Sequence, residues 1–247
     1  MIYEKLPVVL FSALATYRED ETNHVIATYI LNHIDEVRDF GIKDLAQSCH
    51  VGTGSISRFC REIGFNNFAE LKKSLHESTS YDDSHFSPLS LSDHINQAIN
   101  MAAASIDKKQ INKLIQDILT YEHIYAFGLL KAQNAANDFV VDMHMLGVEV
   151  RTSVSYASQI DTMMNVSEKD LIIVFSYTGT YFDAHIWRKE RKILEKAKIW
   201  MIMGGQHEQP AFVDEVIRFD SSLDQRSHPY QLEYIANLIT ETYAKGE

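Results

Sequence analysis

The chain has 247 residues, 45% of them hydrophobic, which is enough for two folded domains. No apolar run approaches the ~20 residues that span a bilayer, and the N-terminal segment lacks a basic stretch followed by a small-residue cleavage site, so we expect a cytoplasmic protein without a membrane partner. Two cysteines exclude a disulfide-rich secreted class, and we interpret Cys49 and Cys60 as small buried hydrophobic residues. The 11 histidines show no metal-ligand spacing, so no metal and no cofactor is expected.

The segment 22–34, TNHVIATYILNHI, is the first with a clear helical pattern. Its apolar residues recur at helical spacing and are Val25, Ile26, Tyr29, Ile30 and Ile34. We expect this helix to complete a three-helix core with the two helices that follow it.

The segment from Ile42 to Lys73 has the layout of two short helices joined by a tight turn. Apolar residues at helical spacing place the first helix from Ile42 to Cys49 and the second from Gly54 to Ile63. The other face of the second helix carries hydroxyl and guanidinium side chains, namely Thr53, Ser55, Ser57, Arg58 and Arg61. Such side chains meet base edges and phosphates when the second helix of a helix-turn-helix enters the major groove. An ordinary helical hairpin is the plainer alternative.

The net charge of −11 at pH 7 counts against a strong general affinity for nucleic acid. Within residues 53–73, however, the cations outnumber the carboxylates; they are Arg58, Arg61, Lys72 and Lys73. We include Lys72 among the expected DNA contacts. Because so few cations bind DNA weakly in one copy, we expect a homodimer or homotetramer that reads two half-sites about one helical turn apart.

A polar stretch divides the chain. Residues 76–90, HESTSYDDSHFSPLS, contain a Ser-Pro step and have the composition of a linker. We therefore predict a multi-domain protein: an all-α helix-turn-helix domain over residues 1–77, a linker over 78–90, and an α/β domain with leading helices over 91–247.

In the second part, short apolar strands alternate with helical segments. Two leading helices are expected, the second capped by Asp107. The expected strands are His123–Phe127, Val148–Thr152, Leu171–Phe175, Ile199–Met203 and Val216–Phe219. The expected helices are Ala132–Leu146, Ser158–Val166, Phe182–Lys196 and Tyr230–Tyr243. This alternation predicts a three-layer α/β domain with a five-stranded parallel sheet covered on both faces.

A hydroxyl-rich turn follows the third predicted strand. Ser176, Thr178 and Thr180 surround Gly179, whose missing side chain lets backbone approach a ligand. Hydroxyl and amide donors in such a turn bind phosphate at the carboxyl ends of parallel strands. The plainer alternative is a solvated turn in which Ser and Thr cap the next helix.

The order of residues in the 42–73 segment resembles the N-terminal domain of the RpiR/MurR family of bacterial transcriptional regulators, whose signature runs I-x-x-L-A-x-x-x-x-V-S-x-x-T-I-x-R-F-C-x-x-L-G-F-x-x-F-x-x-L-K. The matching residues are Ile42, Leu45, Ala46, Val51, Ile56, Arg58, Phe59, Cys60, Gly64, Phe65, Phe68, Leu71 and Lys72, with Ser55 in the Thr position and Ile63 in the Leu position. Gly52 replaces a usual Ser, and Gly54 replaces a frequent Ala. Gly54 weakens the first turn of the second helix by about 1 kcal/mol but does not shift its register.

Residues 120–243 resemble a SIS domain, the sugar-phosphate-binding α/β module that follows the DNA-binding domain in this family. The second phosphate motif of that module is S-x-S-G-x-T. Ser176, Thr178 and Gly179 match it, while Tyr181 replaces the final Thr.

The first SIS motif, G-x-G-x-S after the first strand, is poorly matched. Gly128 is present, but Leu130 replaces the second Gly and Ala132 replaces the Ser, which removes a hydroxyl donor. Lys131 is either a compensating charge or a surface lysine. The effector-binding residues that the resemblance implies are Gly128, Ser176, Thr178, Gly179, Thr180 and Tyr181.

The resemblance implies a regulator of carbohydrate metabolism genes that binds a double-stranded DNA operator. Its small-molecule effector is a phosphosugar held by altered contacts or a different, less polar metabolite, unless the SIS domain serves mainly in dimerisation. The competing class is a SIS-type sugar-phosphate isomerase, with Glu233, His228 and His185 as candidate bases. Because an isomerase has no use for the 42–73 segment, we expect a regulator without catalytic residues.

Overall fold

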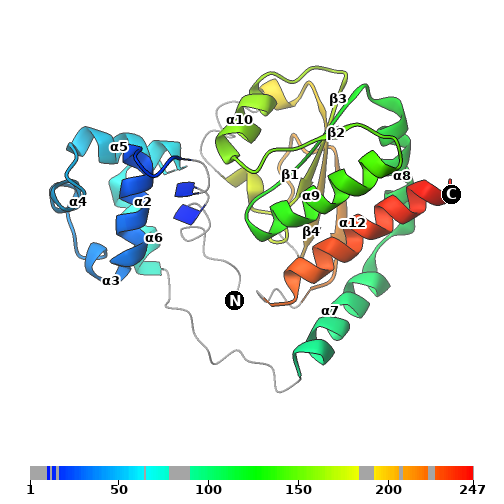
Figure 1. Cartoon of the computed structure of the whole chain (residues 1–247), viewed down its shortest axis with the longest axis horizontal. Coiled ribbons are helices and arrows are strands. Elements are labelled where there is room, and N and C mark those ends of the chain that lie inside the picture. Colours follow the sequence, from blue (N-terminus) through cyan, green and yellow to red (C-terminus); the bar gives the residue numbers. More distant parts are fainter. Residues whose placement is uncertain are drawn as a thin grey trace.

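The computed structural model describes residues 10–11, 13–14, 17–63, 65–77, 90–183, 192–205, 208–221 and 226–246. Its elements form an N-terminal helical group and a C-terminal α/β group, each with its own hydrophobic core (Figure 1). None of the helices in these ranges has the length and hydropathy needed to cross a membrane.

The N-terminal group is entirely helical. Its elements are α2 (Thr22–Asn32), α3 (Ile34–Val37), α4 (Ile42–Ser48), α5 (Thr53–Glu62) and α6 (Phe68–Glu77). α5 packs against α2, α4 and α6, and its Ile56, Phe59 and Cys60 are fully buried. The predicted three-helix core is therefore present, with α6 as a further helix beside α5.

The first predicted helix differs from the structure in two respects. α2 ends at Asn32 and α3 begins separately after His33. Val25, expected on the apolar face, is 39% exposed, because the face that packs consists of Asn23, Ile26, Ala27 and Ile30. The i, i+3, i+4, i+7 series starts at a polar residue, which the hydropathy pattern did not favour.

The turn between α4 and α5 is a Schellman motif. The backbone N–H of Val51 donates to the Ala46 carbonyl at 2.9 Å, and that of His50 donates to the Gln47 carbonyl at 3.1 Å. His50 takes the left-handed position with φ 54°, where glycine is usual. Gly52 then serves as the N-cap of α5, one residue earlier than the predicted start implied.

The C-terminal group contains a five-stranded sheet, all parallel, in the order β2-β1-β3-β4-β5. The strands are β1 (His123–Gly128), β2 (Val150–Arg151), β3 (Asp170–Phe175), β4 (Lys198–Gly204) and β5 (Glu215–Phe219). All five predicted strands are confirmed. The second is shorter than predicted, because it lies at the edge and pairs with β1 at two positions only.

The described helices of this group cover both faces of the sheet. They are α7 (Leu91–Ser105), α8 (Lys108–Thr120), α9 (Lys131–Met145), α10 (Tyr156–Met164), the 3-10 turn η2 (Tyr181–Asp183) and α12 (His228–Lys245). Helices α8, α9 and α12 share one core with β1, β3, β4 and β5, whereas α10 and η2 join a second core on the other face. The predicted three-layer α/β architecture is confirmed.

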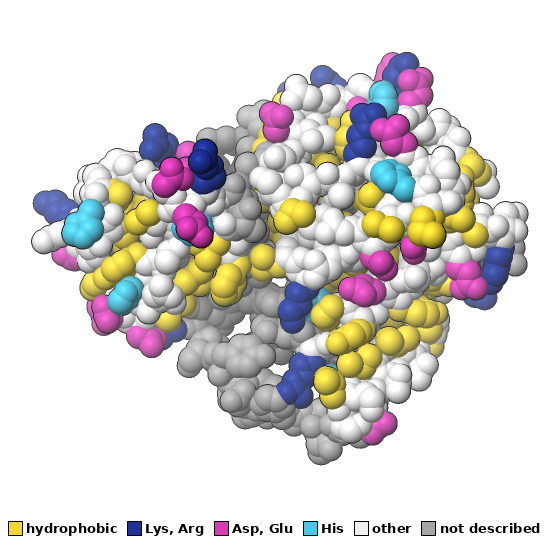
Figure 2. Space-filling model, in the orientation of Figure 1, with side chains coloured by type: hydrophobic (Ala, Val, Ile, Leu, Met, Phe, Trp, Pro, Cys, Tyr) yellow, Lys and Arg dark blue, Asp and Glu magenta, His cyan; other side chains and the backbone are white. Residues whose placement is uncertain are grey.

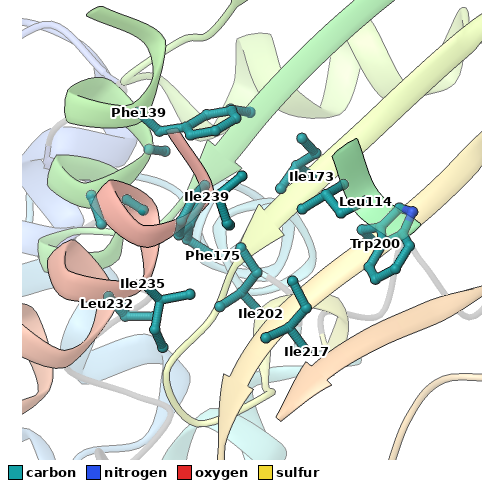
Figure 3. Packing of buried hydrophobic residues seen from close by; sticks show 14 of the residues in the cluster. Leu114, Phe139, Ile173, Phe175, Trp200, Ile202, Ile217, Leu232, Ile235 and Ile239 are labelled. Atoms are coloured by element: carbon teal, nitrogen blue, oxygen red, sulfur yellow. The ribbon is translucent and has the colours of Figure 1, made fainter. Parts of the chain in front are cut away.

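The larger core is built from aliphatic and aromatic side chains of facing layers. Figure 3 shows Phe139 of α9 and Ile239 of α12 directed at Phe175 of β3, and the two phenyl rings lie 5.8 Å apart. Trp200 of β4 is fully buried beside Leu114, and its indole N–H donates to Asp117 Oδ2 at 2.7 Å. β3 is buried along its whole length, as expected for a central parallel strand.

Two predicted segments fall mainly outside the described residues. The linker at 78–90 is described only at Ser90, the N-cap of α7. The helix predicted at Phe182–Lys196 is described only at its two ends, at 182–183 and 192–196.

Candidate functional site

One face of α5 is exposed or half-buried and carries the residues predicted to contact DNA. Thr53 occupies the first turn and is exposed, and Ser55 and Ser57 are half-buried. The Ser57 hydroxyl donates to the Thr53 carbonyl at 3.1 Å. The structure thus places the predicted small hydroxyl residues within the first five residues of α5, at the N-terminal end where a recognition helix contacts base edges.

Two guanidinium groups continue this face. The Arg58 side chain is 60% exposed, with Nε 3.9 Å from Glu62 Oε1, and Arg61 is exposed. Glu62 also accepts hydrogen bonds from Asn23 and from the Tyr17 hydroxyl, so it ties α5 to the N-terminal side of the domain. An exposed ion pair of this length contributes little to stability, so Arg58 can exchange Glu62 for a phosphate or a base.

Lys72 lies on α6 and has a different environment. Its ammonium group donates to the backbone carbonyls of Asp39 at 3.3 Å and Phe40 at 3.0 Å. The Arg38 guanidinium makes the reciprocal connection by donating to the Leu75 carbonyl at 2.9 Å. These bonds hold α6 to the loop after α3, so Lys72 has a structural role beside the DNA contact predicted for it.

Both cysteines are buried thiols in the helix-turn-helix core, as predicted. Burial raises the pKa of Cys49 to about 11 and that of Cys60 to about 12. Because a thiol must lose its proton to become a nucleophile or a metal ligand, both groups are chemically quiet near neutral pH.

The second candidate site lies after β3. Gly179 has φ 77° and its N–H donates to the Ser176 carbonyl at 2.8 Å, which closes the turn. The Thr178 and Thr180 hydroxyl oxygens lie 2.7 Å apart and both residues are half-buried. The Ser176 hydroxyl accepts from the Tyr181 backbone N–H at 3.2 Å. The predicted residues 176–180 therefore form one compact turn with two adjacent hydroxyl groups.

Tyr181 is part of this turn by its backbone only. Its ring is 3% exposed and packs edge-on to Tyr156, and its hydroxyl donates to Gln159 Oε1 at 2.6 Å. Burial raises its pKa well above the ordinary value, so the phenol stays protonated. The phenol therefore acts as an internal hydrogen-bond donor to α10, a role that the phosphate motif did not predict.

The turn from β1 into α9 has a backbone conformation that usually requires glycine, but the residue that adopts it is Leu130. Leu130 has φ 52° and ψ −117°, and the Ala132 N–H donates to the Leu129 carbonyl at 3.0 Å. These values define a type II′ turn with Leu130 at its first central position, where Gly is usual. Gly128 itself has no room for a side chain, because a Cβ there would lie 2.7 Å from the Ala132 carbonyl atoms.

Two glutamines join the two turns, and sequence reasoning missed both. Gln133 Oε1 accepts from the Gly128 N–H at 3.0 Å, and Gln159 Nε2 donates to the Gly128 carbonyl at 3.0 Å. Gln159 Nε2 also lies 3.0 Å from Gln133 Oε1, and Gln159 Oε1 accepts from Tyr181. Both glutamine side chains are buried, with 3% and 0% of their residue surfaces exposed. For Gln133, the sequence held one sign of burial: this residue shares a helix face of α9 with the apolar Ala136 and Phe139.

The candidate bases are not gathered at one place. His228 begins α12, where the sequence predicted a loop, and it is 3% exposed with its ring 4.4 Å from that of Tyr177. Glu233 is half-buried, and burial followed by the nearby Asp138 charge raises its pKa. His185 lies outside the described residues. Among the residues that are described, no three His, Cys, Asp or Glu side chains converge on a metal position.

The N-terminal part of the chain matches a known family model. Residues 18–82 match the helix-turn-helix domain of the rpiR family. The HTH-type transcriptional regulator TTE0211 of Caldanaerobacter subterraneus is 25% identical in an alignment of 166 residues that covers 62% of this chain and 59% of that protein. The chain spans about three fifths of the length of the first curated relatives that it matches.

Solved structures match the C-terminal group as well. The structure of Vibrio vulnificus NanR complexed with ManNAc-6P superposes with a TM-score of 0.54 at 14% identity, covering 98% of this chain and 92% of that chain. The sugar isomerase domain of an RpiR transcription factor from Sphaerobacter thermophilus gives a TM-score of 0.53 at 16% identity, covering 64% and 89%. At these identities the likeness shows the fold alone, which is SIS-like.

Proposed function

We propose that this chain is a transcriptional regulator of carbohydrate metabolism genes. The proposal starts from its RpiR-family helix-turn-helix domain, which is joined to a SIS-like α/β domain. The observation that carries the proposal is the free face of α5, where hydroxyl side chains of the first turns lie beside two exposed guanidinium groups. The opposite face of the helix is fully buried, so the free face is held in one orientation.

Operator binding requires more than one copy of this face. On the face in Figure 2, Lys and Arg side chains lie among Asp and Glu side chains, and the whole chain carries a net charge of −11. A single α5 neutralises few phosphates, so its affinity for DNA is low. We propose a homodimer or homotetramer that places two α5 helices in successive major grooves of one operator.

The proposed effector is a phosphosugar held at the turn of residues 176–180. Two adjacent threonine hydroxyls and a glycine with positive φ support this assignment, since hydroxyl and amide donors at the carboxyl ends of parallel strands bind phosphate. The fold neighbour NanR from Vibrio vulnificus was solved in complex with ManNAc-6P, which supports a sugar phosphate as the class of effector. The effector would bind one arrangement of the oligomer more tightly than the other. Its binding would therefore shift the oligomer toward that arrangement and change the affinity for the operator.

An isomerase is the second candidate, because a fold neighbour is named a sugar isomerase domain. A general base must reach a carbon-bound proton of the substrate. His228 adjoins the turn of residues 176–180 through Tyr177, with the two ring centroids 4.4 Å apart, but it is only 3% exposed. Glu233 lies on α12 beside Asp138. The free face of α5 favours the regulator.

The test is selection of operator fragments from fragmented DNA of the source genome by the purified full-length protein, followed by binding measurements on the enriched fragments. The proposal predicts enrichment of a two-fold symmetric sequence, and a change in its affinity when phosphosugars are added. Recovery of random fragments only, or turnover of a sugar phosphate by the protein, would contradict it.

A further inference from the structure

Resting on the proposed effector site, we propose that Gln133 is a specificity-determining residue of the SIS-like domain. Its carboxamide occupies the β1 side of the site, so the domain recognises the phosphate of a phosphosugar at the β3 turn and makes few contacts with the sugar. The effector class is then a phosphate monoester in which the attached sugar is weakly discriminated.

The position of Gln133 follows from the strand order. The chain runs from β1 outward to β2 and from β3 to β4 in the other direction, so the carboxyl ends of β1 and β3 form the switch point where such sheets bind ligands. Gly128, the last residue of β1, pairs in register with Phe175 of β3, and Ser176 follows directly. A ligand that spans the switch point therefore has one end at the β3 turn and the other at Gly128.

At the β1 end, the hydrogen-bonding groups that a ligand would use are already bonded. Gln133 Oε1 accepts a hydrogen bond from the Gly128 N–H, and Gln159 Nε2 donates one to the Gly128 carbonyl, each at 3.0 Å. Gln133 Nε2 donates to Asn137 Oδ1 at 2.7 Å and to Thr152 Oγ1 at 2.8 Å. Both hydrogens and the oxygen of the Gln133 amide are thus in use, and a sugar hydroxyl entering here would leave buried polar groups without partners.

The network is also fixed from the other side. Gln159 Nε2 donates to the Ser153 carbonyl at 2.6 Å, and Gln159 Oε1 accepts from the buried Tyr181 phenol. Three nearly fully buried side chains, Gln133, Gln159 and Tyr181, therefore span the space from α9 through α10 to η2. Each holds the next, so Gln133 does not swing away without disturbing Gln159.

The β3 turn keeps donors available. Among the described residues, no acceptor binds the backbone N–H groups of Thr178 and Thr180, and their two hydroxyls share a single mutual contact. Two amides and a hydroxyl proton suit the oxygens of a phosphate group. The donors that remain free are therefore on the phosphate side, and the donors that are consumed are on the sugar side.

The test measures dissociation constants of the full-length protein for inorganic phosphate, glycerol 3-phosphate, ribose 5-phosphate and glucose 6-phosphate by calorimetry. We expect the three esters to bind within about fivefold of one another. A preference of about tenfold or more for one sugar phosphate over glycerol 3-phosphate would overturn the role of Gln133 while leaving the proposed effector class intact. Binding of none of the four would overturn the phosphosugar effector itself, and this inference with it.

Variants test the residue directly. Gln133→Ala frees the Gly128 N–H and opens the β1 side, so the spread among the esters should widen to about tenfold, while glycerol 3-phosphate changes by less than about twofold. Asn134→Ala is the matched control, because it removes an exposed carboxamide from the same helix and leaves every bond of Gln133 in place, so its spread should equal that of the unmodified protein. An unchanged spread in a folded Gln133→Ala protein, checked by circular dichroism, would refute the inference. If that variant does not fold, the comparison of esters on the unmodified protein still decides.

Discussion

Replacing Leu130 by Gly and, separately, by Ala separates the backbone strain of the β1–α9 turn from the packing of the side chain. With φ 52° and ψ −117°, Leu130 holds a conformation that disfavours residues with a Cβ by about 1–3 kcal/mol. Gly loses more chain entropy on folding than Ala, which costs about 0.5–1 kcal/mol. The difference predicts that the Leu130→Gly protein is more stable than the Leu130→Ala protein by about 1 kcal/mol, the reverse of the usual order.

Tryptophan fluorescence during urea unfolding of the full-length protein measures this difference. Both tryptophans, Trp187 and Trp200, belong to the C-terminal part of the sequence, and Trp200 is fully buried, so the signal follows the α/β domain. The matched control is the same pair of substitutions at Asn134, an exposed position of α9, where Ala should exceed Gly by about 1 kcal/mol. A Leu130→Ala protein as stable as Leu130→Gly, beside a normal Asn134 pair, would refute the strain argument.

Three further predictions concern the stability of the helix-turn-helix domain, which is measured by circular dichroism during unfolding. His50→Gly should exceed His50→Ala in stability by about 1 kcal/mol, because the exposed His50 holds a left-handed Schellman position; equal stabilities would contradict the turn assignment. Gly54→Ala should stabilise α5 by up to about 1 kcal/mol, since a Cβ there meets no atom within 4 Å; a loss of stability would show a contact that the structure lacks. Burial raises the pKa of the Cys49 and Cys60 thiols from 9.0 to about 11 and about 12, so the folded state binds protons more tightly than the unfolded state. The stability that depends on these thiols is complete below pH 9 and falls up to about pH 11 for Cys49 and about pH 12 for Cys60. At pH 10 the loss should be about 1 kcal/mol for each thiol, and a double Cys→Ala variant with the same pH dependence would disprove the cause.

Local periodicity was enough to predict most of the fold. The 3.6-residue repeat of Ile56, Phe59, Cys60 and Ile63 placed α5 to within a residue, and short apolar runs located all five strands. It failed at Val25, because the packed face of α2 includes the polar Asn23, whose side chain bonds to Glu62 across 39 residues of sequence. A residue that is buried because it bonds to a distant partner cannot be recognised from the local hydropathy pattern.

The proposed effector site was predictable in its backbone and not in its side chains. Gly128 and Gly179 are required by a close approach and by a positive φ, which motif spacing reveals. The glutamine network depends on pairs 26 and 31 residues apart, so no short window contains it. The direction of Tyr181 follows from Gln159 of another helix, and for this reason a motif position that looked like a ligand contact is an internal bond.

We expect α5 to bind operator DNA, and the affinity of the Arg58→Ala protein for a selected operator fragment tests this most directly. The control is Arg18→Ala, which removes a guanidinium group of the same charge that is 82% exposed, against 60% for Arg58, and that lies in the same domain but outside α5. Fluorescence anisotropy at fixed salt should show a loss of about tenfold or more for Arg58→Ala and a change within about twofold for Arg18→Ala. Equal affinities of the two folded variants would contradict the assignment of α5 as the DNA-binding helix.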